Sequence, residues 1–429
     1  MNILHINTSA DEGGAASAVR RLHQGLIQAG YNSRILARSA KIKDDNIFLI
    51  SDVLEGTLGI TGRLSEQAYK RIEKYLGFLY WFFPSTLNLV KTDLFQWADI
   101  VNFHNLHGSY FNPRAIPVLT KSKPVVWTIH DMWPFTGHCG YTYNCEKWVE
   151  GCCRCPVFQD ADMKKEYPRA TPLDMTKIIW RLKQDIYKKS NLYIITPSRW
   201  MRSMVEKSIL GRSVFIECIP NGIDTEKFYP MDKLQARREL GIGGYENVLI
   251  FVAHDVKQIR KGYAYLLSAL EKLQDEFNIC LLLLGEIVFL DARIQNVFIK
   301  RLGYVNSDDL LRLCYNAADL IVLPALADNQ PLVLMEAMAC GTPAVTFDTG
   351  GIPEMVRHMD NGYVARYKDS DDLASGIRLL FRNRNLLSEM SRKCRKIVED
   401  EYSLQLQVKR YRHFYEMAVC EWKKINSTK

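Results

Sequence analysis

The most informative stretch of this sequence is Asp328-Asn-Gln-Pro-Leu-Val-Leu-Met-Glu336, which places two carboxylates eight residues apart across the start of a predicted helix. The apolar run 320–323 precedes it and is typical of a buried parallel strand. Pro331 suits the first turn of a helix, where no backbone N–H is needed. We therefore predict a strand at 320–323, a helix at 332–339 and another strand at 344–347.

The start of this helix favours an anion, because the first N–H groups of a helix have no partner within the helix. A pyrophosphate would accept hydrogen bonds from the N–H groups of Leu332 and Val333. Glu336, about one turn inside the helix, could reach a ribose diol, and Asp328 could reach sugar hydroxyls. Gly350-Gly351 would let a backbone approach closely without a Cβ in the way. A lone Glu would indicate an ordinary helix, whereas the whole constellation indicates a nucleotide-sugar pocket.

At these residues the sequence resembles glycosyltransferase family 4, a large family of retaining enzymes with the two-domain GT-B fold. The family motif is Glu-x7-Glu, whose second Glu matches Glu336 and is expected to bind the donor ribose. The first Glu corresponds to Asp328, and this shorter side chain leaves the identity of the donor sugar open. The resemblance covers nearly the whole chain and is most specific at 303–354. It implies a retaining hexosyltransferase that moves sugar from a UDP- or GDP-sugar to a glycan or lipid-linked acceptor in polysaccharide or glycoconjugate synthesis.

The same resemblance implies a phosphate-binding role for Lys261, which lies between a predicted strand and a predicted helix. Relatives usually carry an Arg a few residues earlier, which this sequence lacks. Lys257 or Arg260 could substitute for it, although Arg260 could also be a solvated surface charge. In relatives, the loop that matches Gly13 and Gly14 lies near the diphosphate and the acceptor. Preorganised cations and N–H groups can neutralise a leaving diphosphate, so we predict transfer that requires no metal and no other cofactor.

Further candidate residues lie at the carboxyl ends of predicted strands, where ligands of open α/β sheets bind. His130 matches a His that lies beside the donor sugar in relatives, and we expect it to position the sugar. Gly303 and Val305 resemble the family's strand end whose backbone contacts the nucleobase. Polar residues after the strand at 100–103 are weaker candidates for acceptor contacts, since single His residues are often structural. They are His104, Asn105 and His107.

The length of 429 residues favours two domains rather than one core. Strands and helices alternate along the chain, as they do in doubly wound parallel sheets. We predict a Rossmann-like acceptor domain at 1–220, a Rossmann-like donor domain at 221–402 and a final helix at 403–429. The resemblance implies that this α/β GT-B fold holds its active site in a central cleft and that the final helix crosses back to the first domain.

The formal net charge of +8 comes from 56 basic and 48 acidic residues, which are dispersed along the chain. Lys70, Arg71 and Lys74 precede the aromatic run 77–83, so this part could lie on an anionic membrane, or it could be an ordinary surface helix. The apolar runs are too short to span a bilayer, and the start of the chain lacks a signal-peptide pattern. We therefore expect a cytoplasmic protein, with peripheral contact to the inner face of the cell membrane if the acceptor is lipid-linked.

Five of the eleven cysteines lie in the loop 138–156. A structural zinc ion there would bind Cys139, Cys145, Cys152 and Cys155, because Cys152 and Cys155 have zinc-knuckle spacing. The spacing of Cys139 and Cys145 is wider than usual, which leaves a set of small buried thiols as the alternative.

Three other functional classes remain open from the sequence. One is another GT-B enzyme, either a sugar-nucleotide epimerase, whose acid/base set is not evident, or an α-glucan phosphorylase, which needs a pyridoxal-phosphate lysine in a much longer chain. The second is a non-catalytic nucleic-acid binder, which would concentrate basic and aromatic residues on one face. The third is a catalytically degenerate GT-B partner subunit, which Asp328 and the missing Arg keep open.

Overall fold

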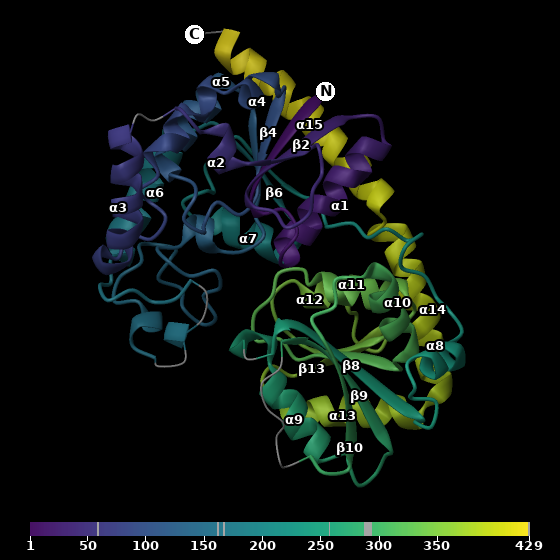
Figure 1. The fold of residues 1–429 in the computed structure, drawn as a ribbon. Helices are drawn as coiled ribbons and strands as arrows, with labels where there is room; N and C mark the ends of the chain where they lie inside the picture. Colours follow the sequence, from purple (N-terminus) through teal and green to yellow (C-terminus); the bar gives the residue numbers. More distant parts are fainter. Residues whose placement is uncertain (58–59, 161–162, 166–167, 257, 287–293, 428–429) are drawn as a thin grey trace. The chain divides into compact units, whose positions relative to one another are not determined.

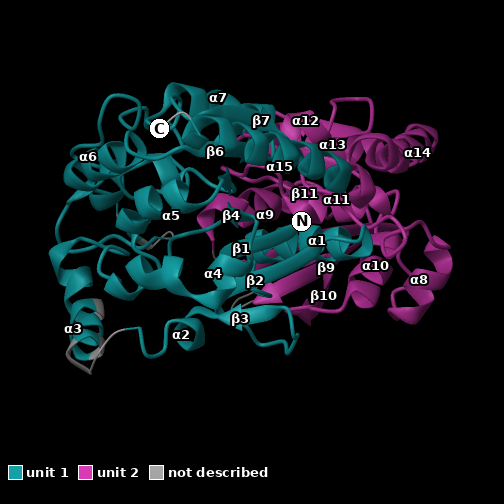
Figure 2. Ribbon diagram, turned by 90° about the horizontal axis from the view of Figure 1, so that it is seen from above, with its two compact units in different colours: residues 1–220, 407–429 teal, residues 221–406 magenta. Residues whose placement is uncertain are grey.

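The computed structural model describes residues 1–427, apart from 58–59, 161–162, 166–167, 257 and 287–293. The chain forms two compact units, coloured separately in Figure 2. Unit 1 comprises residues 1–220 and 407–429, and unit 2 comprises residues 221–406. Both units are α/β, with helices on both faces of a parallel sheet (Figure 1).

Unit 1 is built on a seven-stranded sheet in the order β3-β2-β1-β4-β5-β6-β7. All described pairings in it are parallel. The strands are β1 (Asn2–Ser9), β2 (Asn32–Ser39), β3 (Ile47–Leu49), β4 (Ile100–Phe103), β5 (Val125–Thr128), β6 (Leu192–Thr196) and β7 (Phe215–Cys218). The strand order reverses between β1 and β4, and such a switch point is where ligands bind in doubly wound sheets.

Helix α1 buries an apolar stripe against β1 and β2, in which Ala18, Leu22 and Leu26 are buried. The helices of unit 1 are α1 (Gly14–Gln28), α2 (Ile50–Val53), α3 (Ile60–Leu76), α4 (Asp93–Trp97), α5 (Ile116–Ser122), α6 (Thr176–Tyr187) and α7 (Arg199–Lys207). Short 3-10 helices lie at η1 (Pro84–Lys91), η2 (Pro113–Ala115), η3 (Trp133–Phe135), η4 (Pro156–Phe158) and η5 (Met163–Lys165).

The last helix, α15 (Leu404–Ser427), belongs with unit 1 from residue 407 onward. Its Tyr415 hydroxyl accepts a hydrogen bond from the Asn102 amide at 2.7 Å. Its Tyr411 hydroxyl lies 3.2 Å from the Thr128 hydroxyl. These buried contacts tie the end of the chain to β4 and β5.

Unit 2 is built on a six-stranded parallel sheet in the order β10-β9-β8-β11-β12-β13. The strands are β8 (Asn247–Asp255), β9 (Ile279–Glu286), β10 (Val297–Gly303), β11 (Leu320–Leu323), β12 (Ala344–Phe347) and β13 (Gly362–Ala365). The helices are α8 (Lys233–Glu239), η6 (Ile259–Lys261), α9 (Tyr263–Glu271), α10 (Asp308–Ala317), α11 (Leu332–Ala339), α12 (Ile352–Met355), α13 (Ser370–Arg382) and α14 (Arg384–Glu401).

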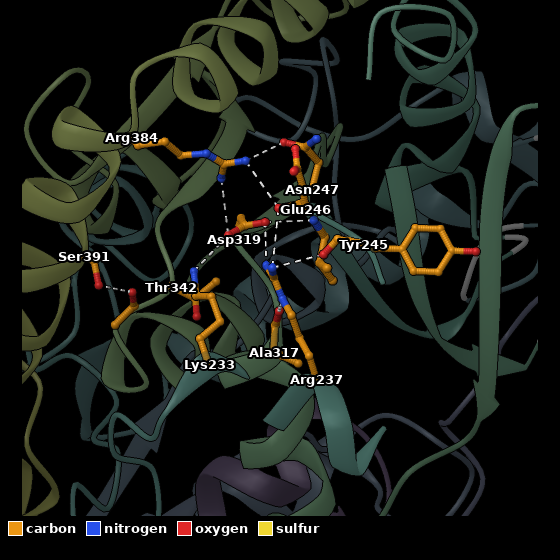
Figure 3. A network of polar contacts seen from close by, with 12 residues as sticks. Lys233, Arg237, Tyr245, Glu246, Asn247, Ala317, Asp319, Thr342, Arg384 and Ser391 are labelled. Atoms are coloured by element: carbon orange, nitrogen blue, oxygen red, sulfur yellow. Dashed lines mark hydrogen bonds and ion pairs between the residues drawn. The ribbon is translucent and has the colours of Figure 1, made fainter. Parts of the chain in front are cut away.

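One buried carboxylate, Asp319, links four elements of unit 2 (Figure 3). It accepts hydrogen bonds from Arg237 of α8 at 2.7 Å, from Lys233 of α8 at 3.0 Å and from the Val248 N–H of β8 at 2.8 Å. Arg384, at the start of α14, lies 3.5 Å from it. Asp319 directly precedes β11, so this cluster fixes the strand whose far end carries the candidate site.

The sequence predicted the elements around the motif well. The strand at 320–323, the helix at 332–339 and the strand at 344–347 have the same bounds in the structure. The predicted α/β fold with two Rossmann-like units is confirmed. No helix among the described residues is both long enough and apolar enough to cross a bilayer.

Candidate functional site

The first part of the candidate site is the loop between β11 and α11. Asp328, Asn329 and Gln330 are buried there, although all three are polar. The Gln330 side chain accepts a hydrogen bond from the Asn221 N–H at 2.8 Å, which fixes the loop against the first residue of unit 2. Pro331 is the residue before the first turn of α11 rather than part of that turn. The N-terminus of α11 is therefore held rigidly at the carboxyl end of β11.

The second carboxylate of the motif, Glu336, is buried on α11. Its Oε2 accepts a hydrogen bond from the Tyr315 hydroxyl of α10 at 2.6 Å. A hydroxyl donor of this kind fixes the rotamer of the carboxylate.

Two cations converge on the first carboxylate, Asp328. Its Oδ2 lies 2.6 Å from the Lys261 Nζ and 3.2 Å from the Arg260 Nη1, and its Oδ1 accepts from the Asn329 N–H at 3.0 Å. The side chains of Asp328, Lys261 and Arg260 are 9%, 13% and 25% exposed. Arg260 is therefore an ion-paired, largely covered residue, and the interpretation of it as a solvated surface charge is wrong. Lys257, the other substitute considered for the missing Arg, lies outside the described residues.

Burial and charge act in opposite directions on this cluster. Burial acts to raise the pKa of Asp328, but Lys261 and Arg260 outweigh it, so the pKa lies below its usual value. Burial lowers the pKa of Lys261, and the Asp328 carboxylate opposes that shift. Two cations thus approach a single carboxylate, and such a convergence of positive side chains favours binding of an anion.

Backbone contacts at two glycines bring these loops together. Gly262 has φ +73°, and a Cβ there would lie 1.7 Å from the carbonyl oxygen of Pro324. Gly350 has φ +58°, and a Cβ there would lie 1.8 Å from the carbonyl oxygen of Asp328. The Leu326 N–H also donates to the Arg260 carbonyl at 2.7 Å. The close approach predicted for Gly350-Gly351 is therefore made to the Asp328 backbone, and it positions the carboxylate.

In unit 1, the predicted residue His130 belongs to a chain of three histidines. The His130 Nε2 lies 3.0 Å from the His104 Nδ1, and the His104 Nε2 lies 3.0 Å from the His5 Nδ1. Burial lowers the pKa of His5 to about 3 and that of His130 to about 4, and it lowers the pKa of His104 well below its usual value. All three rings are therefore neutral at physiological pH.

The chain of histidines restricts the tautomers of its members. Each contact joins an Nδ1 to an Nε2, so in neutral rings the protons must all point the same way. Among the described residues, the buried Nε2 of His5 has no hydrogen-bond partner. An unpaired N–H there would cost more than an unpaired lone pair. This favours protons on the Nδ1 atoms, with the His130 Nε2 accepting from His104.

The other acceptor candidates lie beside this chain. The His107 Nε2 lies 3.0 Å from the Asp131 Oδ2. The Asn105 N–H donates to the Asn7 side chain at 3.1 Å. The carbonyls of Asn105 and His107 both accept from the Thr8 hydroxyl. The structure thus brings His104, Asn105 and His107 together with His130 at one edge of the sheet, beyond β1, β4 and β5.

The three glycines predicted to contact the donor lie where an added Cβ would meet no other atom within 4 Å. Gly13 has φ +87° and precedes α1, and a Cβ on Gly13 or Gly14 would meet nothing within 4 Å. Gly303 ends β10 with φ +66°, and Val305 is half-buried just after it. β10 is the edge strand, separated from β8 by β9, so Gly303 is not joined to the Lys261 cluster by strand pairing.

The predicted zinc ligands lie near one another without forming a metal site in this structure. The Sγ atoms of Cys139 and Cys155 are 4.0 Å apart, and the Cys152 Sγ accepts from the Gly137 N–H at 3.2 Å. Burial raises the pKa of Cys152 to about 12. Within the described parts of the chain, no three His, Cys, Asp or Glu side chains are arranged to hold a metal ion. The zinc site stays a prediction.

Comparison with known proteins identifies the family. Residues 12–227 match the model described as Glycosyltransferase Family 4, and residues 232–397 match the model described as Glycosyl transferases group 1. The chain belongs to glycosyltransferase family 4. The prediction of a glycosyltransferase of this family is thus confirmed, and the epimerase, phosphorylase and nucleic-acid-binding alternatives are set aside.

Relatives of this family 4 glycosyltransferase include WcaC of Escherichia coli (strain K12), which is named for colanic acid biosynthesis. It is 26% identical over 370 residues, which cover 83% of this chain and 85% of WcaC. The N-acetyl-alpha-D-glucosaminyl L-malate synthase of Bacillus anthracis is 28% identical over 47% of this chain and 53% of that protein. Anabaena HepE, solved with UDP and glucose, has a TM-score of 0.65 at 16% identity and covers 97% of this chain and 100% of that chain. This structural likeness shows the GT-B fold.

Several residues of the candidate site escaped the sequence analysis. Tyr315, in the last turn of α10, donates a hydrogen bond to Glu336, and no local pattern marks it. His5 lies inside the first strand, where alternation suggests only a core residue. Asp131 follows His130 directly, and this His-Asp pair was the one signal that could have indicated its contact with His107.

Proposed function

We propose that this family 4 glycosyltransferase moves a sugar from a UDP- or GDP-sugar to a glycan or lipid-linked acceptor, with retention of anomeric configuration. The observation that carries the proposal is the cluster of Lys261, Arg260 and Asp328 beside the N-terminus of α11. Its two converging cations and the N–H groups of Leu332 and Val333 suit the diphosphate of such a donor. The HepE structure with UDP and glucose supports a nucleotide-sugar donor for this fold.

In this proposal the two carboxylates have different tasks. Glu336, held by Tyr315, accepts hydrogen bonds from the ribose diol. Asp328 holds the Lys261 Nζ in place before the donor arrives, and then contacts the sugar hydroxyls when Lys261 turns to the diphosphate. A preformed cluster of this kind requires little rearrangement when charge develops on the leaving group.

The chemistry follows from the diphosphate as leaving group. Lys261, Arg260 and the helix N–H groups neutralise the charge that grows as the bond to the sugar breaks, so the transfer requires no divalent metal. The acceptor hydroxyl attacks from the side that the diphosphate leaves, and the leaving phosphate takes the acceptor's proton. His130, neutral and oriented by His104, positions the sugar rather than acting as a base.

The remaining parts of the proposal concern the surroundings of the site. The acceptor is taken up beyond β4 by the region of His104, Asn105 and His107. The loop 138–156 holds a structural zinc ion once its four thiols close around it. The enzyme is cytoplasmic and works at the inner face of the membrane, where a lipid-linked acceptor would lie.

Donor binding and donor hydrolysis test the proposal directly. We would measure both across UDP- and GDP-sugars, with EDTA present, for the wild type, Lys261→Ala and the control Lys272→Ala. Lys272 is a partly exposed lysine just after α9 in the same unit. We expect one donor to bind saturably without metal, and we expect binding to weaken at least tenfold in Lys261→Ala only.

Other outcomes have defined meanings. Loss of binding with EDTA would contradict metal independence. Equal affinity in Lys261→Ala and the wild type would remove Lys261 from the donor site. A folded wild type that binds no donor would favour the degenerate partner subunit, with Asp328 as the first suspect.

A further inference from the structure

Helix α3 presents an apolar stripe to solvent. Leu64, Ile72 and Tyr75 are 61%, 45% and 70% exposed, and Ala68 between them is also exposed. Their spacings of four, four and three residues place them on one face of the helix. Exposed apolar side chains scattered singly need no explanation, but a contiguous stripe marks an interaction surface.

The acidic residues of α3 point the opposite way. Glu73 is buried, and its carboxylate accepts hydrogen bonds from the Tyr80 N–H at 3.1 Å and the Ser109 hydroxyl at 2.9 Å. Glu66, two turns earlier on the same side, accepts from the Ser85 hydroxyl at 3.2 Å. An ordinary surface helix buries its apolar side, whereas α3 exposes an apolar stripe and buries a carboxylate on the opposite side.

Cations border the exposed stripe. Arg71 and Lys74 are exposed, and within the described part of the chain neither forms an ion pair. Leu173 extends the apolar surface beyond the helix, because its backbone packs against Gly77 and its side chain is 50% exposed. With both acids turned inward, the outer face of α3 combines apolar side chains with uncompensated positive charge.

We propose that this outer face of α3 docks on an anionic lipid bilayer. Apolar side chains flanked by Arg and Lys match the boundary between acyl chains and anionic headgroups. A second copy of the chain is a poorer partner, since a two-fold contact through this face would bring Arg71 and Lys74 of both copies into one interface, while Glu66 and Glu73 of both copies face inward. α3 lies at the outer edge of unit 1 in both views (Figures 1 and 2).

This inference deepens the proposed function, because it gives a transferase with a lipid-linked acceptor the surface that meets the lipid. Its test does not depend on the transfer reaction. We would measure co-sedimentation of the full chain with vesicles of phosphatidylglycerol mixed with phosphatidylcholine, and with vesicles of phosphatidylcholine alone. Donor affinity, measured in the same preparations, would reveal separately whether the donor site is intact.

Three variants separate the contribution of the cations to vesicle binding from that of the apolar side chains. Arg71→Gln with Lys74→Gln should weaken partitioning to the anionic vesicles about 25-fold, at about fivefold for each cation. Leu64→Gln with Tyr75→Gln should weaken it at least tenfold. The matched control Leu234→Gln changes a leucine on α8 that is also 61% exposed, and it should leave partitioning unchanged. Donor affinity should be the same in all of them.

The proposal fails if the wild type does not sediment with anionic vesicles, or if it sediments equally with neutral ones. It fails equally if Leu234→Gln weakens partitioning as much as the α3 variants do. A molecular mass by light scattering that is twice that of one chain, and that halves in Leu64→Gln with Tyr75→Gln, would show that a second copy covers this face instead.

Discussion

The ion pair between Lys261 and Asp328 offers the sharpest test of the site, because its stability and its binding roles can be separated. We consider Lys261→Met, Asp328→Asn and the double variant. Removing one partner of a buried ion pair costs about 3–5 kcal/mol, since the other charge stays buried and uncompensated. Arg260 remains 3.2 Å from Asp328, so Lys261→Met should lie at the lower end, near about 3 kcal/mol. Asp328→Asn removes the carboxylate that both cations approach, and should cost about 4 kcal/mol.

The double variant should lose less than the sum of the single variants. Neither a buried carboxylate nor a buried ammonium remains at the pair, so we expect a coupling free energy of about 2 kcal/mol. Urea unfolding monitored by circular dichroism, at the same pH for all four proteins, measures these differences. Additive losses would refute the conclusion that the two side chains form one electrostatic unit.

The pH dependence of this pair has a definite sign. The pKa of Asp328 in the folded chain lies below the ordinary value of 3.8, because of Lys261 and Arg260. A depressed carboxyl pKa contributes stability that is present above the ordinary value and is lost as the pH falls through the folded pKa. The difference in unfolding free energy between the wild type and Asp328→Asn should therefore be constant near neutral pH and shrink below pH 3.8. An unchanged difference at acid pH would contradict the ion pair.

Three further variants test other parts of the structure. Asp319→Ala should lower the free energy of unfolding by about 3–5 kcal/mol, because the buried guanidinium of Arg237 loses the carboxylate it pairs with. Donor affinity in the folded protein should stay the same. Scanning calorimetry for unfolding and titration calorimetry for donor binding would together show that Asp319 has a structural role. Gly350→Ala should weaken donor binding at least tenfold, because the added Cβ would displace the Asp328 carbonyl. The control Gly244→Ala should leave donor binding unchanged, because a Cβ at that position would meet no atom within 4 Å. His104→Ala should lower the kcat of donor hydrolysis about tenfold or more, with little change in donor affinity, because His130 loses the side chain that orients it. His104→Gln should restore part of the lost kcat. An unchanged kcat in His104→Ala would show that His104 does not orient His130.

The elements nearest the motif could be predicted because their signals are local. The bounds of β11, α11 and β12 followed from an apolar run, from Pro331 before the helix and from Gly341 after it. In the structure Gly341 has φ +75°, which suits a glycine that ends a helix. Helix and strand periodicity likewise sufficed for the fold class. These signals depend only on residues close in sequence, so no knowledge of tertiary packing was needed.

The partners of the site residues could not be predicted, because they come from distant parts of the chain. Lys261 and Asp328 are 67 residues apart, and His5 and His104 are 99 residues apart. The orientation of α3 was equally hidden, since its pattern fits burial of either face until the partners of Glu73 are known. Such pairings follow from sheet topology, and sequence spacing alone does not encode them.

The position of Arg260 bears on the Arg that relatives usually carry and that this chain lacks. Its Nη1 and the Lys261 Nζ approach the same oxygen of Asp328, so both cations already lie where one anion can meet them. The shorter Asp at position 328 fits this geometry, because adjacent residues 260 and 261 bring both cations to the carboxylate from a single turn of η6. We infer that Asp328 and Arg260 replace the usual Glu and Arg as a pair. Each of the two residues should therefore favour donor binding only when the other is present. Asp328→Glu should weaken donor binding in the wild type and should have little further effect on donor binding in Arg260→Ala. Equal losses in both backgrounds would show that the two departures from the family pattern are independent.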